Sequence, residues 1–116
     1  TLTTGIYTNK LHRPSLAFLQ AALIQPCDLP TVVVTHHLPS LQCVHLRHQG
    51  SLLNQGFATD LDDFILQTQP DYWMYGHSHS NMPVIEIGRT RLITNQLGYC
   101  GYGEGAGFAP QKWIEL

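Results

Sequence analysis

The chain has 116 residues, of which 43% are hydrophobic, so it can build one small domain with a core but not two. It has 6 lysine and arginine residues against 8 aspartate and glutamate residues, and no run of basic residues could follow a phosphate backbone. No apolar stretch reaches the roughly 20 residues that cross a bilayer. We therefore expect neither nucleic acid nor a membrane as a partner.

The N-terminal part of the chain predicts a helix followed by a short strand. Three leucines of residues 15–25 share one helical face, with Ser15 as the expected cap and two prolines after the last turn. Residues 31–35 form a β-branched run without alternation, which is typical of a strand covered on both faces. We expect this strand to end at His36.

The middle of the chain predicts a long loop and a second helix. Residues 38–58 carry proline, glycine and serine without periodicity, which indicates a surface loop with one helical turn near Leu52. A capping-box pattern from Thr59 to Asp62 then begins a helix, and Pro70 ends it. Loops of this length in a small domain are usually functional or disordered.

The C-terminal part predicts strands and a hairpin. Residues 72–75 form a strand, and residues 83–94 form two strands joined by a type II′ turn at Gly88. The glycine-rich residues 98–110 predict a flexible loop, and residues 111–116 predict a closing strand. The fold class that follows is α/β, with parallel strands, a crossover helix and then a β-hairpin.

Two pairs of histidines follow the strands of the crossover unit. Such a unit almost always makes two parallel strands of one sheet, whose carboxyl ends lie at the same edge. Neighbouring strands are about 4.8 Å apart, so the histidines after one strand would stand beside those after the other. Open α/β sheets bind ligands at this edge. These residues are His36, His37, His77 and His79.

This arrangement predicts a metal site. Imidazole is the commonest metal ligand from proteins, and three converging rings can hold zinc, manganese or iron. We expect Gly76 to let the backbone turn sharply, because it has no Cβ. Ser78 is small enough to point away, so that the rings on either side of it can enter one site.

Three segments resemble the C-terminal half of calcineurin-like metallophosphoesterases: VVVTHHLPS, DYWMYGHSH and IGRTRLITNQLGY. The resemblance covers nearly the whole chain and implies an αββα sandwich, of which residues 1–116 are the C-terminal half without the N-terminal half. It implies a hydrolase that cleaves a phosphomonoester or phosphodiester at two divalent metal ions, which are manganese, iron or zinc. It assigns His36 and His77 to one ion and His79 to the other.

The chain also departs from this family. The family's other ligands lie in Asp-x-His, Gly-Asp-x-x-Asp and Gly-Asn-His motifs, and none of these occurs here. The family's Asn-Pro-x-Gly-Tyr segment corresponds to residues 95–99, with Gln96 in place of proline. Three neutral imidazoles cannot supply the negative charge that holds two dications together. We therefore expect a phosphatase or phosphodiesterase only in the intact protein, and an inactive isolated chain.

Two other functions stay open from the sequence. The first is a non-catalytic metal-binding or interaction module with a single three-histidine site. The second is a lone zinc hydrolase on the same three histidines, for which no carboxylate is placed as a general base. Half a sandwich would expose an apolar face, so we expect a homo-oligomer or a complementary N-terminal half as partner, besides the phosphate-ester substrate.

Further residues carry weaker expectations. His37 is the candidate catalytic residue that is not a metal ligand. We expect its ring to make a hydrogen bond to the backbone, and it could also orient His36 or contact the substrate phosphate. His45 and His48, beside Arg47, could line a phosphate pocket, although such residues are more often solvated. We expect the two arginines of the hairpin to face solvent.

The tryptophans and cysteines complete the sequence-based expectations. Trp73 and Trp113 each lie in an apolar strand pattern and are predicted to be core residues. The three cysteines are an odd number without CxxC spacing, which argues against a disulfide framework and a thiolate zinc site. We expect reduced thiols in a cytoplasmic protein.

Overall fold

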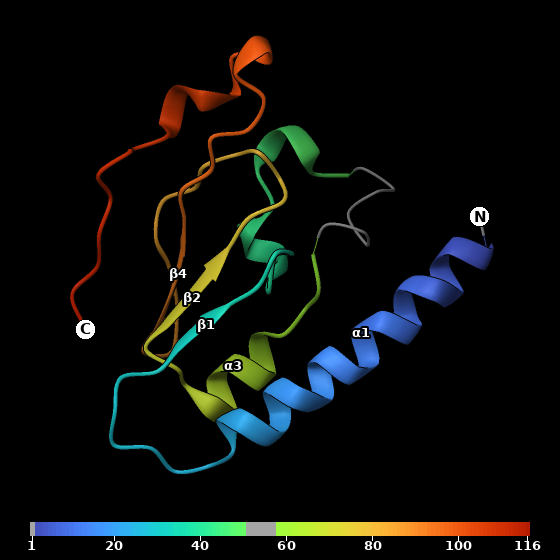
Figure 1. The fold of residues 1–116 in the computed structure, drawn as a ribbon, viewed down its shortest axis with the longest axis vertical. Coiled ribbons are helices and arrows are strands. Elements are labelled where there is room, and N and C mark those ends of the chain that lie inside the picture. Colours follow the sequence, from blue (N-terminus) through green and yellow to red (C-terminus); the bar gives the residue numbers. More distant parts are fainter. Residues whose placement is uncertain (1, 51–57) are drawn as a thin grey trace.

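Four strands form one mixed sheet at the centre of the domain (Figure 1). The computed structural model describes residues 2–50 and 58–116. The strands lie in the order β1-β2-β4-β3, with β1, β2 and β4 parallel and β3 antiparallel to β4. Their bounds are Val32–Val34 for β1, Tyr72–Tyr75 for β2, Ile85–Ile87 for β3 and Thr90–Thr94 for β4. The described residues thus form an α/β domain with a mixed four-stranded sheet and two α-helices.

The crossover unit is confirmed. The helix α3 (Asp62–Thr68) lies between β1 and β2 in the chain, and the two strands pair in parallel with Val33 opposite Trp73. The hairpin is confirmed as well, since Ile87 pairs with Thr90 across the turn. Gly88 has a φ of +59° while Arg89 has no positive φ, as a type II′ turn requires.

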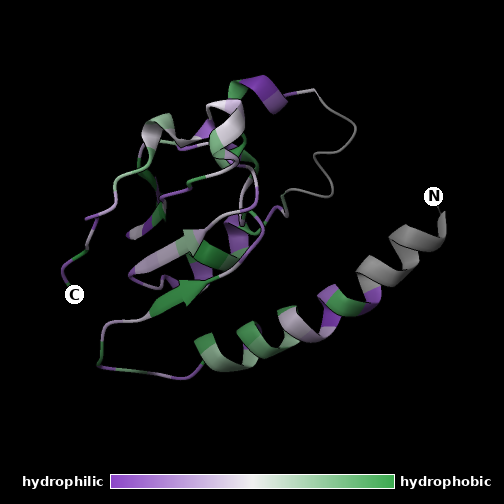
Figure 2. Cartoon of the chain, turned by 45° about the horizontal axis from the view of Figure 1, so that its top comes forward, coloured by the Kyte–Doolittle hydropathy of each residue, from purple (hydrophilic) through white to green (hydrophobic). Residues whose placement is uncertain are grey.

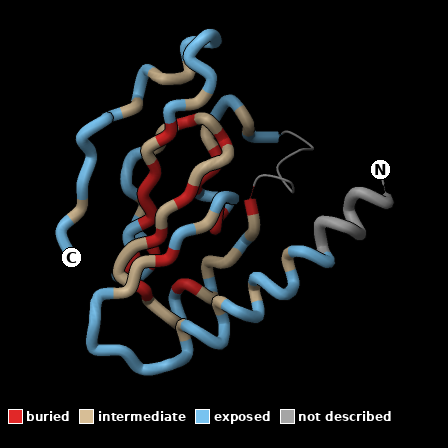
Figure 3. The backbone as a smooth tube through the Cα atoms, in the orientation of Figure 1, coloured by how far each residue is buried: buried red, intermediate tan, exposed pale blue. Residues whose placement is uncertain are grey.

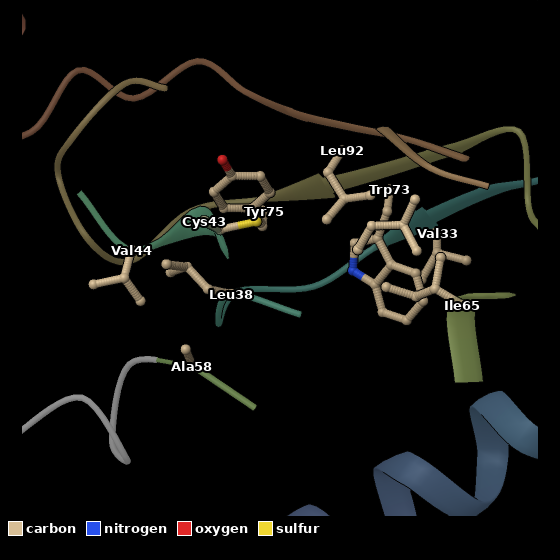
Figure 4. Packing of buried hydrophobic residues seen from close by; sticks show 10 residues of the cluster. Val33, Leu38, Cys43, Val44, Ala58, Ile65, Trp73, Tyr75 and Leu92 are labelled. Carbon is tan, nitrogen blue, oxygen red and sulfur yellow. The ribbon is translucent and has the colours of Figure 1, made fainter. Parts of the chain in front are cut away.

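The core lies between α3 and one face of the sheet (Figure 4). Trp73 is fully buried, as predicted, and its ring makes an edge-on contact with Phe64 at 6.5 Å. Its Nε1–H donates to Thr35 Oγ1 at 2.9 Å, so the polar edge of the indole is satisfied. Ile65 of α3 is also fully buried, which fixes the helix against the strands that precede the histidines.

The first helix, α1 (Leu2–Leu23), begins well before Ser15, so the predicted cap is wrong. Ser15 Oγ donates to the carbonyl of Leu11 within the helix, at 3.2 Å. A serine hydroxyl can bond to the carbonyl four residues earlier, so a serine alone does not mark a helix start. The predicted end of the helix, before the prolines, is confirmed.

Little of α1 is buried against the sheet. Leu19 and Leu23 pack against the core, while Phe18 remains 71% exposed. Figure 2 shows hydrophobic residues along the described part of α1, and Figure 3 shows that most of its surface is exposed. No helix in the described part of the chain combines the length and the apolar character needed to span a bilayer.

The loop before α3 differs in detail from the prediction. It contains two 3₁₀ turns, η1 (Leu41–Cys43) and η2 (Leu46–His48), whereas the helical turn expected near Leu52 lies outside the described residues. The capping box is wrong, because Thr59 pairs its N–H with the carbonyl of Leu38 instead of starting the helix. In its place, the Asp60 carboxylate accepts a hydrogen bond from the backbone N–H of Asp62 at 3.3 Å.

Two predictions of burial are wrong at the edges of the sheet. The strand β1 is not covered on both faces, since Val33 is buried but Val34 is 71% exposed. Residues 111–116 do not form a strand, and Trp113 is 73% exposed. The tail is attached to the sheet by single bonds, such as the one from Lys112 Nζ to the carbonyl of Thr94, and not by a β-ladder.

The glycine-rich segment after β4 is more regular than the expected flexible loop. It contains the 3₁₀ turns η3 (Cys100–Tyr102) and η4 (Glu104–Gly107). Gly103 joins them in the left-handed region with a φ of +70°. This segment returns the chain toward the histidine turn that follows β2.

Candidate functional site

The ends of β1 and β2 bring two histidines into contact. The parallel pairing continues past the strands, because Gly76 N–H donates to the carbonyl of His36 at 3.0 Å. Nε2 of His36 then lies 2.9 Å from Nδ1 of His77, and the two ring centroids are 4.8 Å apart. The side chains from two distant turns therefore meet at the sheet edge, as the sequence predicted.

His37 makes a third ring of this group. Its centroid lies 4.5 Å from that of His77 and 5.1 Å from that of His36. The hydrogen bond that we expected from its ring to the backbone is not found within the described residues. Its carbonyl instead accepts a hydrogen bond from Thr35 Oγ1 at 2.8 Å, which holds the backbone after β1.

The rings of His37 and His77 favour the neutral form. Burial lowers the pKa of His37, and the neighbouring His36 and His12 rings lower it further. Burial also lowers the pKa of His77, as do the other three histidines of the two turns. A metal ligand must be the neutral imidazole, so these rings are held in the form that binds metal.

His79 contacts other residues than the three grouped rings. Its Nδ1 lies 2.9 Å from Glu104 Oε2, and its ring makes an edge-on contact with Tyr99 at 4.6 Å. Among the described residues, no group of three or more histidine, cysteine, aspartate or glutamate side chains is placed to hold one metal ion. The structure thus brings the rings of His36, His37 and His77 into contact, while His79 is near enough to lower the pKa of His77 and is bonded to Glu104.

The His36 and His77 nitrogens are close enough to share an ion after a small movement. Two nitrogens that bind one tetrahedral zinc ion at about 2.0–2.1 Å lie roughly 3.3–3.4 Å apart. The observed separation of 2.9 Å is that of a hydrogen bond between the rings, and His36 is exposed to solvent. The pair is an incomplete ligand set, because a hydrolytic two-metal centre also needs bridging and negatively charged ligands.

The residues of this turn with a left-handed backbone conformation are histidines and not the glycine. His77 has a φ of +71° and His79 a φ of +52°, whereas Gly76 has no positive φ. The expected role of Gly76 in turning the chain is therefore wrong. Non-glycine residues in the left-handed region persist only where surrounding contacts hold them, and such residues cluster at functional sites.

Gln96 supplies many of these contacts, and the sequence did not single it out for this role. Its side-chain oxygen accepts the N–H of His79 at 2.7 Å. Its amide nitrogen donates to Ser78 Oγ at 3.1 Å and to Thr94 Oγ1 at 2.9 Å. The side chain of Asn81 donates to the Gln96 carbonyl and accepts the Gln96 N–H, so the backbone that carries the buried Gln96 side chain is held in place. Gln96 stands where the resembling family has proline.

Arg47 holds the same turn from the other side. Its Nη2 donates to the carbonyls of Ser78 at 3.3 Å and His79 at 3.1 Å, and its Nε–H donates to His48 Nε2 at 3.0 Å. The Nδ1 of His45 accepts the backbone N–H of Arg47. Arg47 and its two neighbouring histidines thus make bonds within the protein, and no sequence pattern indicated the contact with the turn.

Glu104 is the third residue whose contact with the turn the sequence did not indicate. Its Oε2 accepts the backbone N–H of Tyr99 at 2.7 Å in addition to its contact with His79. The Tyr99 hydrogen bond lowers the pKa of this carboxyl, and His79 and Arg47 lower it further against the opposing effect of burial. Glu104 is therefore a carboxylate at neutral pH and can only accept hydrogen bonds.

The remaining charged residues lie outside this group. Arg89 and Arg91 face solvent, as predicted, and Arg91 is 3.6 Å from Glu86. Asp71 accepts the N–H of Thr31 at 2.8 Å, so this carboxylate has a structural role. A groove of about 900 Å³ runs between α1 and the end of β1, and both His36 and His37 lie on its wall.

Comparison of the chain with protein-family models, with curated proteins and with solved structures finds no match in any of the three. The class that the fold defines is an α/β domain with a histidine group at the carboxyl edge of its parallel strands.

Proposed function

We propose that this chain carries the histidine ligands of a dinuclear metallophosphoesterase centre, which in the intact protein hydrolyses a phosphomonoester or phosphodiester. The observation that carries the proposal is the 2.9 Å separation of His36 Nε2 and His77 Nδ1 at the ends of adjacent parallel strands. The resemblance of the two histidine segments to calcineurin-like metallophosphoesterases supports it.

Each histidine has a separate task in this proposal. His36 and His77 hold one divalent ion, which is manganese, iron or zinc, and His79 holds the other through Nε2. His37 stands beside the first pair, where its neutral ring can donate one hydrogen bond to a phosphoryl oxygen. The ions would supply Lewis acidity, which polarises the phosphoryl group and makes water a nucleophile at neutral pH.

The chain alone lacks the acidic part of such a centre. Three of its aspartates have other contacts: Asp71 accepts the Thr31 N–H, Asp60 accepts the Asp62 N–H, and Asp62 accepts from Gln42 Nε2. Glu104 contacts the far nitrogen of His79 and does not reach the His36 pair. The carboxylates of the centre would come from an N-terminal half of the domain, so the isolated chain should be inactive.

The exposed surfaces of the sheet support a missing second half. The side chain of Val34 on β1 is 71% exposed, that of Trp113 in the C-terminal tail is 73% exposed, and β1 is an open edge of the described sheet. In an αββα sandwich, a second sheet would cover the face of the sheet beside which this tail lies. A complementary N-terminal half or a second copy of the chain could cover this exposed surface. Three free cysteines suit a reducing, cytoplasmic compartment.

The test is an assay of the intact protein that contains this chain. With manganese added, it should cleave a nitrophenyl phosphate monoester or diester. His36→Asn and His77→Asn should each lower kcat/KM at least about 100-fold, because each removes an imidazole from the proposed centre. Asparagine is the suitable replacement because it tolerates the positive φ of His77.

The matched control is His45→Asn. His45 is a histidine outside the group, and asparagine can still accept the N–H of Arg47. This variant should keep its activity. Loss of activity in all three variants alike, or no hydrolysis by the wild type, would contradict the proposal. One bound metal per chain without hydrolysis would instead indicate a non-catalytic metal-binding module.

A further inference from the structure

His79 has two ring nitrogens, and among the described residues only Nδ1 has a hydrogen-bond partner. Nδ1 lies 2.9 Å from Glu104 Oε2, in a contact where the His79 side chain is 33% exposed and the Glu104 side chain 17% exposed. A neutral imidazole carries its proton on one nitrogen and offers a lone pair on the other. The contact with an acceptor therefore decides which nitrogen can bind a metal ion.

Glu104 is itself fixed in place. The same Oε2 accepts the backbone N–H of Tyr99 at 2.7 Å, and the ring of Tyr99 packs edge-on against His79. The carboxylate, the backbone amide and the imidazole thus form one connected group. Since an ionised carboxylate has no proton to donate, the hydrogen between Glu104 and His79 must sit on Nδ1.

The close approach of Glu104 depends on Gly98. A Cβ at this position would lie 2.6 Å from Glu104 Cβ, 2.7 Å from its Oε2 and 3.2 Å from His79 Cβ. Gly98 also has a φ of +65°, which strains other residues. The chain therefore has a glycine where any side chain would push the carboxylate away from the ring.

We propose that Glu104 is a positioning residue for His79, which holds its proton on Nδ1 and leaves Nε2 as the single nitrogen able to bind a metal ion. Carboxylates bound to the far nitrogen of a ligand histidine fix its tautomer and its ring orientation, and they make it a stronger ligand. The metal-binding part rests on the proposed function, while the tautomer is a property of the chain alone.

The tautomer can be measured by nitrogen NMR of the imidazole rings at pH 8 without metal, where an ordinary imidazole with a pKa of about 6.5 is neutral. Wild-type His79 should carry its proton on Nδ1, which is the less common tautomer of free histidine. Glu104→Ala should shift His79 to the Nε2-protonated form or to a mixture. Glu104→Gln keeps an acceptor oxygen and should retain the Nδ1 proton in part.

Two controls separate positioning from a general loss of structure. Glu86→Ala removes an exposed carboxylate on β3 and should leave the His79 tautomer unchanged. Gly98→Ala should act like Glu104→Ala. Gly50→Ala adds the same backbone strain at a φ of +78°, with no atom within 4 Å of the new Cβ, and should not alter the ring.

A second readout is the binding of Mn²⁺ by the intact protein that contains this chain, followed by paramagnetic broadening of each histidine ring signal in turn. The apparent affinity at His79 should fall about 10–100-fold in Glu104→Ala and stay unchanged in Glu86→Ala. A wild-type His79 protonated on Nε2, or an Nδ1 proton that persists in Glu104→Ala, would overturn the inference. If the expected tautomers are found but the intact protein binds no Mn²⁺, the proposed function fails while the positioning of the ring by Glu104 stands.

Discussion

Nε2 of His36 and Nδ1 of His77 lie 2.9 Å apart, although 41 residues separate them in the chain. The contact follows from the parallel pairing of β1 with β2, which continues through the bond from Gly76 N–H to the His36 carbonyl. Without a metal ion, one ring donates a hydrogen bond to the other. With an ion, the two nitrogens would have to move apart by about 0.4 Å to become adjacent ligands in a tetrahedral site.

The stability of the metal-free chain should decrease in mild acid. The pKa of His37 and that of His77 are lowered from 6.5 in the folded chain, chiefly by burial. Between pH 6.5 and the lower folded values, the unfolded chain binds more protons, so the free energy of unfolding falls as the pH decreases. Urea denaturation in the presence of a chelator should give a lower midpoint at pH 5.5 than at pH 7.5.

The control for this pH effect is a double variant, His37→Gln with His77→Asn. It lacks both imidazoles whose pKa is lowered, so its urea denaturation midpoint should depend less on pH between pH 5.5 and pH 7.5. An unchanged or higher wild-type midpoint at pH 5.5 would show that these rings do not gain protons on unfolding.

Loss of the Ile65 side chain should strongly destabilise the fold. Ile65 is fully buried between α3 and the sheet, so Ile65→Ala should cost about 2–5 kcal/mol of unfolding free energy. The neighbouring Leu66 is 46% exposed, and Leu66→Ala should cost less than about 1 kcal/mol. Both values come from urea unfolding, and similar losses in the two variants would argue against this packing of α3.

Gln96 should stabilise the histidine turn through hydrogen bonds. Gln96→Met keeps the length of the side chain but leaves the N–H of His79 and two buried hydroxyls without this partner. We expect a loss of about 1–3 kcal/mol for each buried group left unpaired, and faster hydrogen exchange at the His79 amide. The exposed Gln42→Met variant should change stability by no more than about 0.5 kcal/mol. Equal losses of stability in Gln96→Met and Gln42→Met would contradict the role of Gln96 in holding the turn.

The three cysteines should differ in reactivity. Cys27 and Cys100 are exposed, whereas Cys43 is buried, and burial raises the pKa of the Cys43 thiol to about 11. The thiolate is the reactive form, so a disulfide reagent at pH 8 should modify two thiols quickly and the third only as the chain unfolds. Rapid modification of all three in the folded chain would place Cys43 at the surface.

The sequence predicted the elements that local patterns specify. The β-branched and aromatic runs indicated β1 and β2, and Gly88 indicated the hairpin turn. The apolar pattern around Trp113 predicted burial in the same way. That residue is exposed because the last residues have no neighbouring strand with which to pair.

The histidine group was predictable only in part. The edge at which His36 and His77 meet follows from the order of strand, helix and strand. The contacts of Gln96, Arg47 and Glu104 with the turn depend on side chains that are 17 to 32 residues distant in the chain. No period or motif specifies such contacts, so the pairing of His79 with Glu104 emerged only from the structure.

The central claim is that His36 and His77 share one metal ion and that His79 binds another. The most direct test is an anomalous difference map from crystals of the intact protein that contains this chain, grown with Mn²⁺. We predict one peak between His36 Nε2 and His77 Nδ1 and a second peak at His79 Nε2. The absence of a peak at the His36 and His77 pair, or a single peak bound by all three rings, would contradict the account.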